Sequence, residues 1–310
     1  MDIRKDFEFT SVSGKVPVLR TASPLGALAA LIGTWNGHGF NQIWRPNQGA
    51  DHFLELNETI ETIEFTEIPG DIPNRGLGLL GQVDINLHGL TYLQQVQDAN
   101  VPGPNGKPAG IHIEPGIWIN IPPTTNPLDP ATVARLANIP HGTSFVAQGT
   151  VLPTINHAPT FEAASITPFE IGNPGKLIQF PTETNLSNPS TLRTAPADIP
   201  HVTQQMVDNP NVFLSQATNL NKITSTTTLK ISTLDLNPPS SGGGTSNIAF
   251  LQGASAGPNA QAVQVDATFW IETFEEDGHI KHQLQYFQRV LLNFNTLSWP
   301  HVSVATLIKQ

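Results

Sequence analysis

The chain contains no cysteine, few charged residues and no long hydrophobic run. The absence of cysteine excludes disulfides, CxxC zinc sites, iron–sulfur clusters and thiol catalysis. Charged residues make up 13% of the chain, its 15 lysines and arginines form no cluster, and the net charge is −10. A protein of this kind offers little attraction to nucleic acid or to an anionic membrane surface. We therefore expect neither of these as a partner.

Targeting and membrane signals are also missing from the sequence. The longest strongly apolar stretch, residues 25–32, is far too short to cross a bilayer as a helix. The first residues, Met1 to Asp6, lack the charged-then-apolar plan of a secretory signal peptide. A soluble protein in the cytoplasm is therefore the expectation.

Proline and glycine are abundant, with 27 and 25 residues spread along the 310-residue chain. They divide it into short segments, many of which alternate polar and apolar residues as strands do. This pattern is typical of an all-β protein with long loops, and we predict a single antiparallel β-barrel of about ten strands in one domain, residues 1–310. The predicted strands are residues 34–44, 53–65, 83–97, 110–121, 144–152, 161–171, 222–234, 246–251, 262–274, 279–294 and 301–308.

Helices are expected to be few and short. Ser23 is a potential N-cap and Pro24 a first-turn residue for a helix over residues 24–31, which could plug one end of a barrel. A similar Asp-Pro start predicts a helix over residues 129–137, and a third helix is predicted near residues 206–218.

Three segments are predicted to lie outside the regular structure. Residues 1–32 form an N-terminal extension that contains the plug helix. Residues 181–204 are rich in Pro, Ser, Thr and Asn, and residues 237–245 read Asn-Pro-Pro-Ser-Ser-Gly-Gly-Gly-Thr. These compositions indicate long loops.

Two glycine motifs do not have the sequence context that their chemistry needs. Residues 76–81 match GxGxxG, but a dinucleotide site requires a strand before the motif and a helix after it. Residues 253–257 match GxSxG, yet Pro258 and a strand-like segment follow where a nucleophile elbow needs a helix. Both are interpreted as loops. His279 and His282 flank an Asp-Gly turn and are interpreted as solvated turn residues.

His301 is an unusual polar residue in the apolar stretch that ends the chain. Read with a period of two, residues 301, 303, 305 and 307 share one face, and residues 302, 304, 306 and 308 share the other. Ser303 and Ala305 are small, so space is left beside the imidazole. A neutral imidazole in a roomy apolar site suits a metal ion or a haem iron. The local pattern alone favours a packed, hydrogen-bonded core histidine.

Four segments, taken in order, change this interpretation. The first, Gly33-Thr34-Trp35-Asn36-Gly37-His38-Gly39, resembles the opening strand of the nitrobindins, a calycin-like family of small β-barrels that bind haem. Three later segments resemble the same family: residues 111–118 (IHIEPGIW), 146–150 (VAQGT) and 297–307 (LSWPHVSVATL). The resemblance covers about a fifth of the chain, which is roughly twice the length of a nitrobindin domain, so the remainder would consist of insertions and extended strands.

The resemblance implies roles for particular residues. It implies haem b as the cofactor and His301 as the ligand of the haem iron, because the closing element of that family supplies the iron-binding histidine. His112 would lie on the opposite, distal side of the pocket, where it is the candidate catalytic acid or base. Ile111, Gln148 and Leu291 fall where the family lines its pocket. Trp35, counted with the cofactor-binding set, is expected to close the bottom of the core.

Three functions follow from these patterns. The resemblance implies a haem protein that handles nitric oxide, peroxynitrite or peroxide, as a peroxynitrite isomerase or a peroxidase-like enzyme in the enzymatic variant. A haem-free, lipocalin-like carrier of an apolar small molecule is the alternative, since calycin barrels enclose such cavities. A filled barrel that acts through its loops or as a homo-oligomer is the third.

Overall fold

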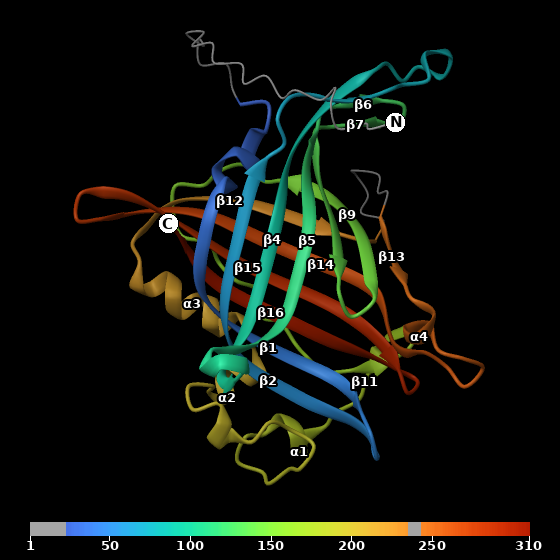
Figure 1. The fold of residues 1–310 in the computed structure, drawn as a ribbon, viewed down its shortest axis with the longest axis vertical. Helices are drawn as coiled ribbons and strands as arrows, with labels where there is room; N and C mark the ends of the chain where they lie inside the picture. Colours follow the sequence, from blue (N-terminus) through green and yellow to red (C-terminus); the bar gives the residue numbers. More distant parts are fainter. Residues whose placement is uncertain (1–22, 235–242) are drawn as a thin grey trace, which may run out of the picture.

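The structure, a computed structural model, describes residues 23–234 and 243–310. Ten antiparallel strands follow one another around a barrel, and the barrel closes because β1 pairs with β16 as well as with β2. In order around the barrel they are β1 (Gly33–Asn47), β2 (Ala50–Glu67), β4 (Ile85–Pro102), β5 (Pro108–Ile121), β8 (Thr132–Ile139), β9 (Thr143–Val151), β12 (Ile223–Ser232), β14 (Asn259–Glu276), β15 (His279–Phe294) and β16 (Leu297–Lys309) (Figure 1). The predicted all-β class and ten-stranded barrel are confirmed.

The remaining elements are short. The minor strands are β3 (Ile72–Asn74), β6 (Thr124–Thr125), β7 (Leu128–Asp129), β10 (Phe169–Glu170), β11 (Asn173–Leu177) and β13 (Gly244–Asn247). The α-helices are α1 (Pro181–Thr184), α2 (Gln204–Asp208), α3 (Asn211–Leu220) and α4 (Ala249–Gln252), and the 3-10 helices are η2 (Gly26–Leu31), η3 (Gly78–Leu80), η4 (Pro104–Gly106) and η5 (Pro196–Asp198). In the described parts of the chain, no helix has the length and hydrophobicity that a bilayer crossing requires.

Close approach of two backbones explains the glycines of the opening motif. A Cβ atom added to Gly37 would lie 2.0 Å from the Thr306 carbonyl oxygen, and one added to Gly39 would lie 2.6 Å from that of Val304. Both glycines pair with β16 where the barrel closes. Side chains at these positions would push the first and last strands apart, so the two glycines of the motif allow the barrel to close.

One end of the barrel is filled by apolar side chains. Leu28 and Leu31 of η2 pack against Trp35 and Trp118, and all four are almost completely buried. The Trp35 indole donates a 2.6 Å hydrogen bond to the Leu31 carbonyl, which fixes the short helix on the barrel. The predicted plug is therefore present as a 3-10 helix, and Trp35 closes the core as expected. Residues 1–22 of the predicted extension lie outside the described residues.

A long segment between β9 and β12, residues 152–222, covers the outside of the barrel and builds a second core there. It carries α1, α2 and α3, which Figure 1 shows outside the barrel in the lower part of the view. Apolar side chains of the segment pack on outward-facing residues of the barrel strands. The buried residues of this outer core include Ile166, Ile199, Met206, Leu214, Phe40, Trp44, Leu54, Trp299, Val302 and Val304.

Strand β16 is consequently buried on both faces. Ala305 and Leu307 belong to the core inside the barrel, whereas Val302 and Val304 belong to the outer core. The alternation predicted for residues 301–307 is confirmed. Apolar residues occur at successive positions because both faces of the strand are covered.

Two predicted elements are wrong. Residues 129–137 form no helix, because residues 132–139 are the strand β8, whose alternate side chains Val133, Arg135 and Ala137 are all buried. Ala and Leu favour a helix by intrinsic propensity, but pairing with β5 on one side and β9 on the other overrides it. Residues 161–171 form no strand except at β10, because this stretch belongs to the outer segment.

The loop and turn predictions have mixed outcomes. Residues 181–204 are mostly irregular but carry α1, η5 and the first residue of α2, and the helix predicted near residues 206–218 is present as α2 and α3. The predicted strand 246–251 is half right, since β13 ends at Asn247 and α4 follows. Residues 237–242 of the predicted loop 237–245 lie outside the described residues, and β13 begins at Gly244.

Both glycine motifs are turns, as predicted. Exposed η3 occupies the middle of residues 76–81, and no helix follows before β4. In residues 253–257, a 3.0 Å hydrogen bond from the Gly257 amide to the Ala254 carbonyl closes a tight turn that leads into β14. Neither turn offers the helix N-terminus that nucleotide binding or a nucleophile elbow requires.

Glu272 supports a prediction about stability. Its side chain is fully buried on β14, and it accepts a hydrogen bond from the Gln283 amide while its second oxygen has no partner. Burial raises the pKa of Glu272 to about 8, although the Gln283 bond opposes the shift. In the folded protein the Glu272 carboxyl keeps its proton up to a pH of about 8, whereas in the unfolded chain it loses the proton above its ordinary pKa of 4.5. The free energy of unfolding therefore falls as pH rises from 4.5 towards 8.

We therefore expect Glu272→Gln to stabilise the protein by roughly 3 kcal/mol at pH 8 and to have little effect at pH 4.5. Urea unfolding at the two pH values, followed by tryptophan fluorescence, measures the difference. Glu275→Gln, an exposed neighbour on the same strand, is the control and should change neither value. Equal stabilisation by Glu272→Gln at both pH values would contradict the prediction.

Candidate functional site

A cavity of about 330 Å³ occupies the end of the barrel opposite the apolar plug. His301 from β16, and Ile111 and His112 from β5, line it together. The two histidines come from strands four steps apart in the ten-stranded order, so they lie on different sides of the cavity. Eight of the other wall residues are aliphatic: Ile43, Val96, Ile139, Leu251, Ala260, Ala262, Val290 and Leu292. Most of the remaining wall residues are polar or charged.

His301 faces this cavity without a protein partner. Among the described residues, none forms a hydrogen bond or an ion pair with its ring. Burial, together with the nearby His112 and His141, lowers the pKa of His301 to about 3. The imidazole is therefore neutral at physiological pH and keeps a nitrogen lone pair available to a ligand.

A β-bulge brings two successive residues of β5 to the cavity. The pairing of β4 with β5 shifts by one residue between Val96, opposite His112, and Gln97, opposite Gly110, so Ile111 is left unpaired. Successive side chains of a regular strand point to opposite faces, and a bulge re-aims them. This irregularity explains why both Ile111 and His112 line the cavity.

His141 is a second histidine on the same side of the cavity, which sequence reasoning missed. It lies in the turn between β8 and β9, and its ring centroid is 5.9 Å from that of His112. Partial burial of its ring lowers the pKa of His141, and the neighbouring His112 adds to the effect. The sequence signal was weak, because a single histidine between Pro140 and Gly142 is typical of an exposed turn.

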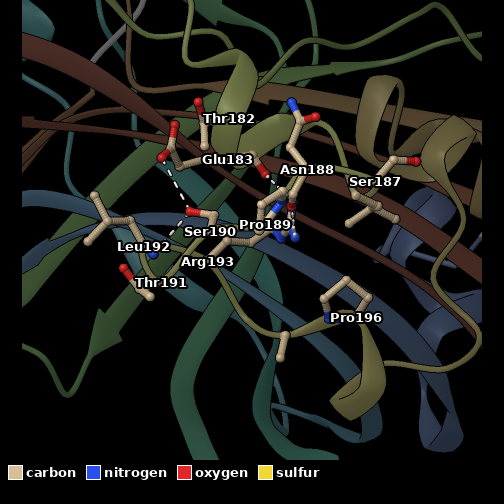
Figure 2. A pocket seen from close by; sticks show the side chains of 12 residues that line it. Thr182, Glu183, Ser187, Asn188, Pro189, Ser190, Thr191, Leu192, Arg193 and Pro196 are labelled. Atoms are coloured by element: carbon tan, nitrogen blue, oxygen red, sulfur yellow. Dashed lines mark hydrogen bonds between the residues drawn. The ribbon is translucent and has the colours of Figure 1, made fainter.

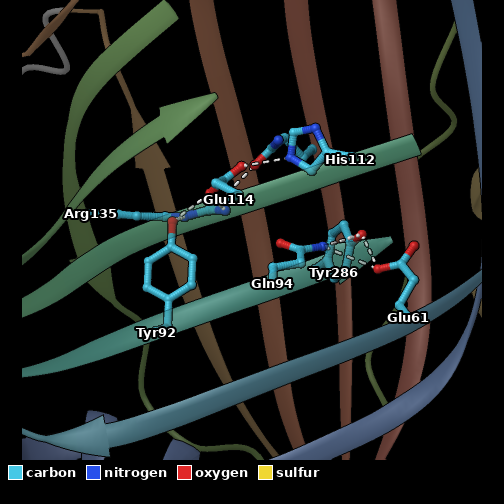
Figure 3. Close-up of polar contacts among 8 residues, drawn as sticks. Glu61, Tyr92, Gln94, His112, Glu114, Arg135 and Tyr286 are labelled. Carbon is cyan, nitrogen blue, oxygen red and sulfur yellow. Dashed lines mark hydrogen bonds and ion pairs between the residues drawn. The ribbon is translucent and has the colours of Figure 1, made fainter. Parts of the chain in front are cut away.

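Below His112 lies a buried ion pair, shown in Figure 3. Glu114 accepts a hydrogen bond from the Arg135 guanidinium and another from the Tyr92 hydroxyl. Arg135 also donates to the Tyr92 oxygen at 2.8 Å and to the Gln288 side chain at 2.7 Å. Burial alone would raise the pKa of Glu114, but the Arg135 charge, the nearby His112 and the Tyr92 hydrogen bond together outweigh it and lower the pKa to about 2. Glu114 is therefore ionised.

The same carboxylate reaches His112. Glu114 Oε2 is 3.5 Å from His112 Nε2, and this oxygen has no other partner. Orientation of an imidazole by a buried carboxylate favours the tautomer that carries its proton on the nearer nitrogen. The other ring nitrogen of His112 then remains available to accept a proton.

A second polar group completes the floor of the cavity. The Tyr286 hydroxyl donates to Glu61 at 2.6 Å, and the Gln94 amide donates to the Tyr286 oxygen at 2.9 Å and to Glu61 at 3.1 Å (Figure 3). Burial raises the pKa of Glu61, although these hydrogen bonds oppose the shift. The cavity thus combines aliphatic walls with a floor of hydrogen-bonded polar groups.

Three residues of the sequence-predicted site lie elsewhere. Gln148 donates a 2.9 Å hydrogen bond to the Thr132 hydroxyl, while its neighbour Ala147 points into the barrel core. Leu291 is buried but contributes nothing to the cavity wall, which the adjacent residues Val290 and Leu292 form. Trp35 lies in the plug at the opposite end.

A larger surface hollow surrounds Arg193 in the outer segment (Figure 2). The Arg193 guanidinium donates to the carbonyl oxygens of Glu183 at 3.1 Å, Asn185 at 2.7 Å and Asn188 at 3.1 Å. Its donors are therefore used to hold the loop together. We assign this hollow a structural role, and the barrel cavity is the candidate site.

Comparisons with known proteins add little to this description. No family model matches the chain, and no curated protein matches it significantly. Its structure is similar to a solved structure described as the crystal structure of Rv2717c from M. tuberculosis, with a TM-score of 0.42 and 15% sequence identity. That similarity covers 93% of this chain and 98% of the other. An identity this low transfers no activity, so the function is argued from the residues of the cavity.

Proposed function

We propose that this chain is a haem-binding barrel in which the His301 imidazole would hold the iron. The observation that carries the proposal is the state of His301: a neutral ring, without a hydrogen-bond partner among the described residues, that faces an enclosed cavity. The ring is half-buried, and its free nitrogen lone pair could bind a metal ion.

The donor set suits haem better than a bare metal ion. The described residues include no cluster of three or more histidine or carboxylate side chains that could hold a metal. A metal bound at His301 would therefore need most of its ligands from another source, and the porphyrin of haem supplies four. The aliphatic walls suit the apolar faces of such a ring.

His112 supports a reactive role for the opposite side of the cavity. Haem iron with an open position binds nitric oxide, and activates peroxide or peroxynitrite when a polar group is near. His112 is held by the ionised Glu114, so its free nitrogen can accept a proton from a bound ligand or return one. We assign His112 this acid–base role.

A second function, carriage of a compact apolar molecule, is favoured by the size of the cavity. Its volume of about 330 Å³ lies at the low end of the range for small-molecule pockets, about 300–1,000 Å³. A ligand smaller than a porphyrin would fill it without displacing side chains at the mouth.

Titration of the purified protein with haemin tests the first function against the second. We expect a Soret band that shifts and saturates at one haemin per chain. Absence of a saturable Soret change would contradict haem binding. If the fluorescent dye anilinonaphthalene sulfonate nevertheless bound with one-to-one stoichiometry, the carrier function would be supported instead.

A further inference from the structure

The barrel wall has a break beside the cavity. Pairing between β5 and β8 ends at Gly116, which lies opposite Ala137. Beyond that point β5 continues to Pro108 and pairs only with β4. The turn between β8 and β9, residues 140–142, therefore stands next to β5 without a backbone hydrogen bond to it among the described residues.

Two hollows meet at this break. One is the barrel cavity, and the other is a depression on the outer surface between the end of β4, β5 and the β8–β9 turn. Four residues line both hollows: Val96, Ile111, His112 and His141. These side chains are the partition that separates the cavity from solvent at the side of the barrel.

The two histidines of the partition are held differently. His112 is half-buried and lies against Glu114, which the Arg135 guanidinium fixes in turn. His141 is exposed, and no described residue forms a hydrogen bond with its ring. The backbone of the turn is anchored away from β5, by a 2.8 Å hydrogen bond from the Ile248 amide to the Gly142 carbonyl. The His141 side chain can therefore rotate while its backbone stays in place, as exposed side chains do within nanoseconds.

We propose that this break is a side entrance to the cavity, closed by the His112–His141 pair, which admits small, uncharged molecules able to form hydrogen bonds. The outer hollow presents the Thr62 hydroxyl, the Gln95 and Gln97 amides and the two imidazoles, and no Lys, Arg, Asp or Glu lines it. Its polarity differs from that of the mouth at the barrel end, where Arg45 forms an ion pair with Glu55. The entrance concerns access to the cavity and does not depend on haem as its occupant.

The absence of cysteine allows a direct test. Ser303 lines the cavity on the same face of β16 as His301, so Ser303→Cys places a single thiol inside a chain that has no other. The rate at which methyl methanethiosulfonate modifies this thiol in the otherwise unchanged protein reports how fast a small uncharged molecule reaches the cavity. The rate is measured by mass spectrometry without added haem.

In the Ser303→Cys protein we expect His141→Ala to raise this rate several-fold and His141→Trp to lower it several-fold. Because both changes are at an exposed turn residue, they should leave the barrel folded, which thermal unfolding checks. Gln95→Trp, at an exposed position of the outer hollow, should also slow the reaction. Arg45→Trp, at the mouth at the barrel end, is the matched control and should change the rate less than His141→Trp does.

The proposal is overturned if the His141 and Gln95 variants all react at the rate of Ser303→Cys alone while Arg45→Trp slows the reaction. That result would place the entry route at the barrel end. A failure of haem binding would not affect this experiment, so the two proposals fail separately.

Discussion

Replacement of Arg135 by methionine is expected to destabilise the protein by about 3–5 kcal/mol, because it leaves the buried Glu114 carboxylate without its cation. Arg135 is almost fully buried, donates to Glu114, Tyr92 and Gln288, and lies close to four aromatic rings. Methionine keeps much of the side-chain volume, so the loss reports the charge and the hydrogen bonds. The change in urea midpoint, followed by tryptophan fluorescence, measures it.

Two companion variants show whether the unpaired charge is the cause. In Glu114→Gln/Arg135→Met both charges are absent, so the double variant should be more stable than Arg135→Met alone. Arg289→Met removes a partly exposed ion pair with Asp266 and should cost no more than about 1 kcal/mol. If Arg135→Met were as mild as Arg289→Met, the ion pair would not stabilise the barrel as we infer.

Replacement of His301 by alanine has the largest expected effect on ligand binding. If His301 is the axial ligand, His301→Ala loses the saturable Soret shift, with affinity for haemin at least tenfold weaker, or roughly 1.4 kcal/mol. His301 forms no hydrogen bond with a described residue, so alanine breaks no protein contact of that kind and the barrel should remain folded. Spectroscopic haemin titration measures the loss.

Chemical rescue separates an iron ligand from a residue that only shapes the cavity. In His301→Gly, added imidazole should restore the Soret band, because it can take the place of the missing ring. His282→Ala, which removes a half-buried histidine far from the cavity on β15, is the matched control and should bind haemin as the unchanged protein does. Equal haemin binding by His301→Ala and His282→Ala would exclude His301 as the ligand.

The barrel could be predicted from the sequence because most of its strands carry their own signal. Alternation of polar and apolar residues along residues 53–65 indicates a strand without any knowledge of its partners. β8 was not predicted, because Ala, Leu and Arg favour a helix locally and only the flanking strands make residues 132–139 extended. The outer core was not predicted either, since it brings residues 166–214 against barrel strands far away in the sequence.

The site was predicted in part for a similar reason. His301 and His112 were found from short motifs, and the structure brings both to one cavity. Arg135 was not identified, because its segment was predicted to be a helix instead of a barrel strand. His141 reaches the cavity because its turn lies next to the part of β5 that does not pair with β8. Gln148 was placed by resemblance, but its side chain lies on the face of β9 opposite Ala147.

Because β16 is buried on both faces, substitutions at its odd-numbered and even-numbered positions have different effects. Substitutions at positions 301 and 303 change the cavity, whereas those at positions 302 and 304 change the fit of the outer segment. Ligand affinity and stability can therefore be altered separately within four consecutive residues. Variants at Ser303 should differ in the ligands that they bind, whereas variants at Val302 and Val304 should differ in how tightly the outer segment packs on the barrel.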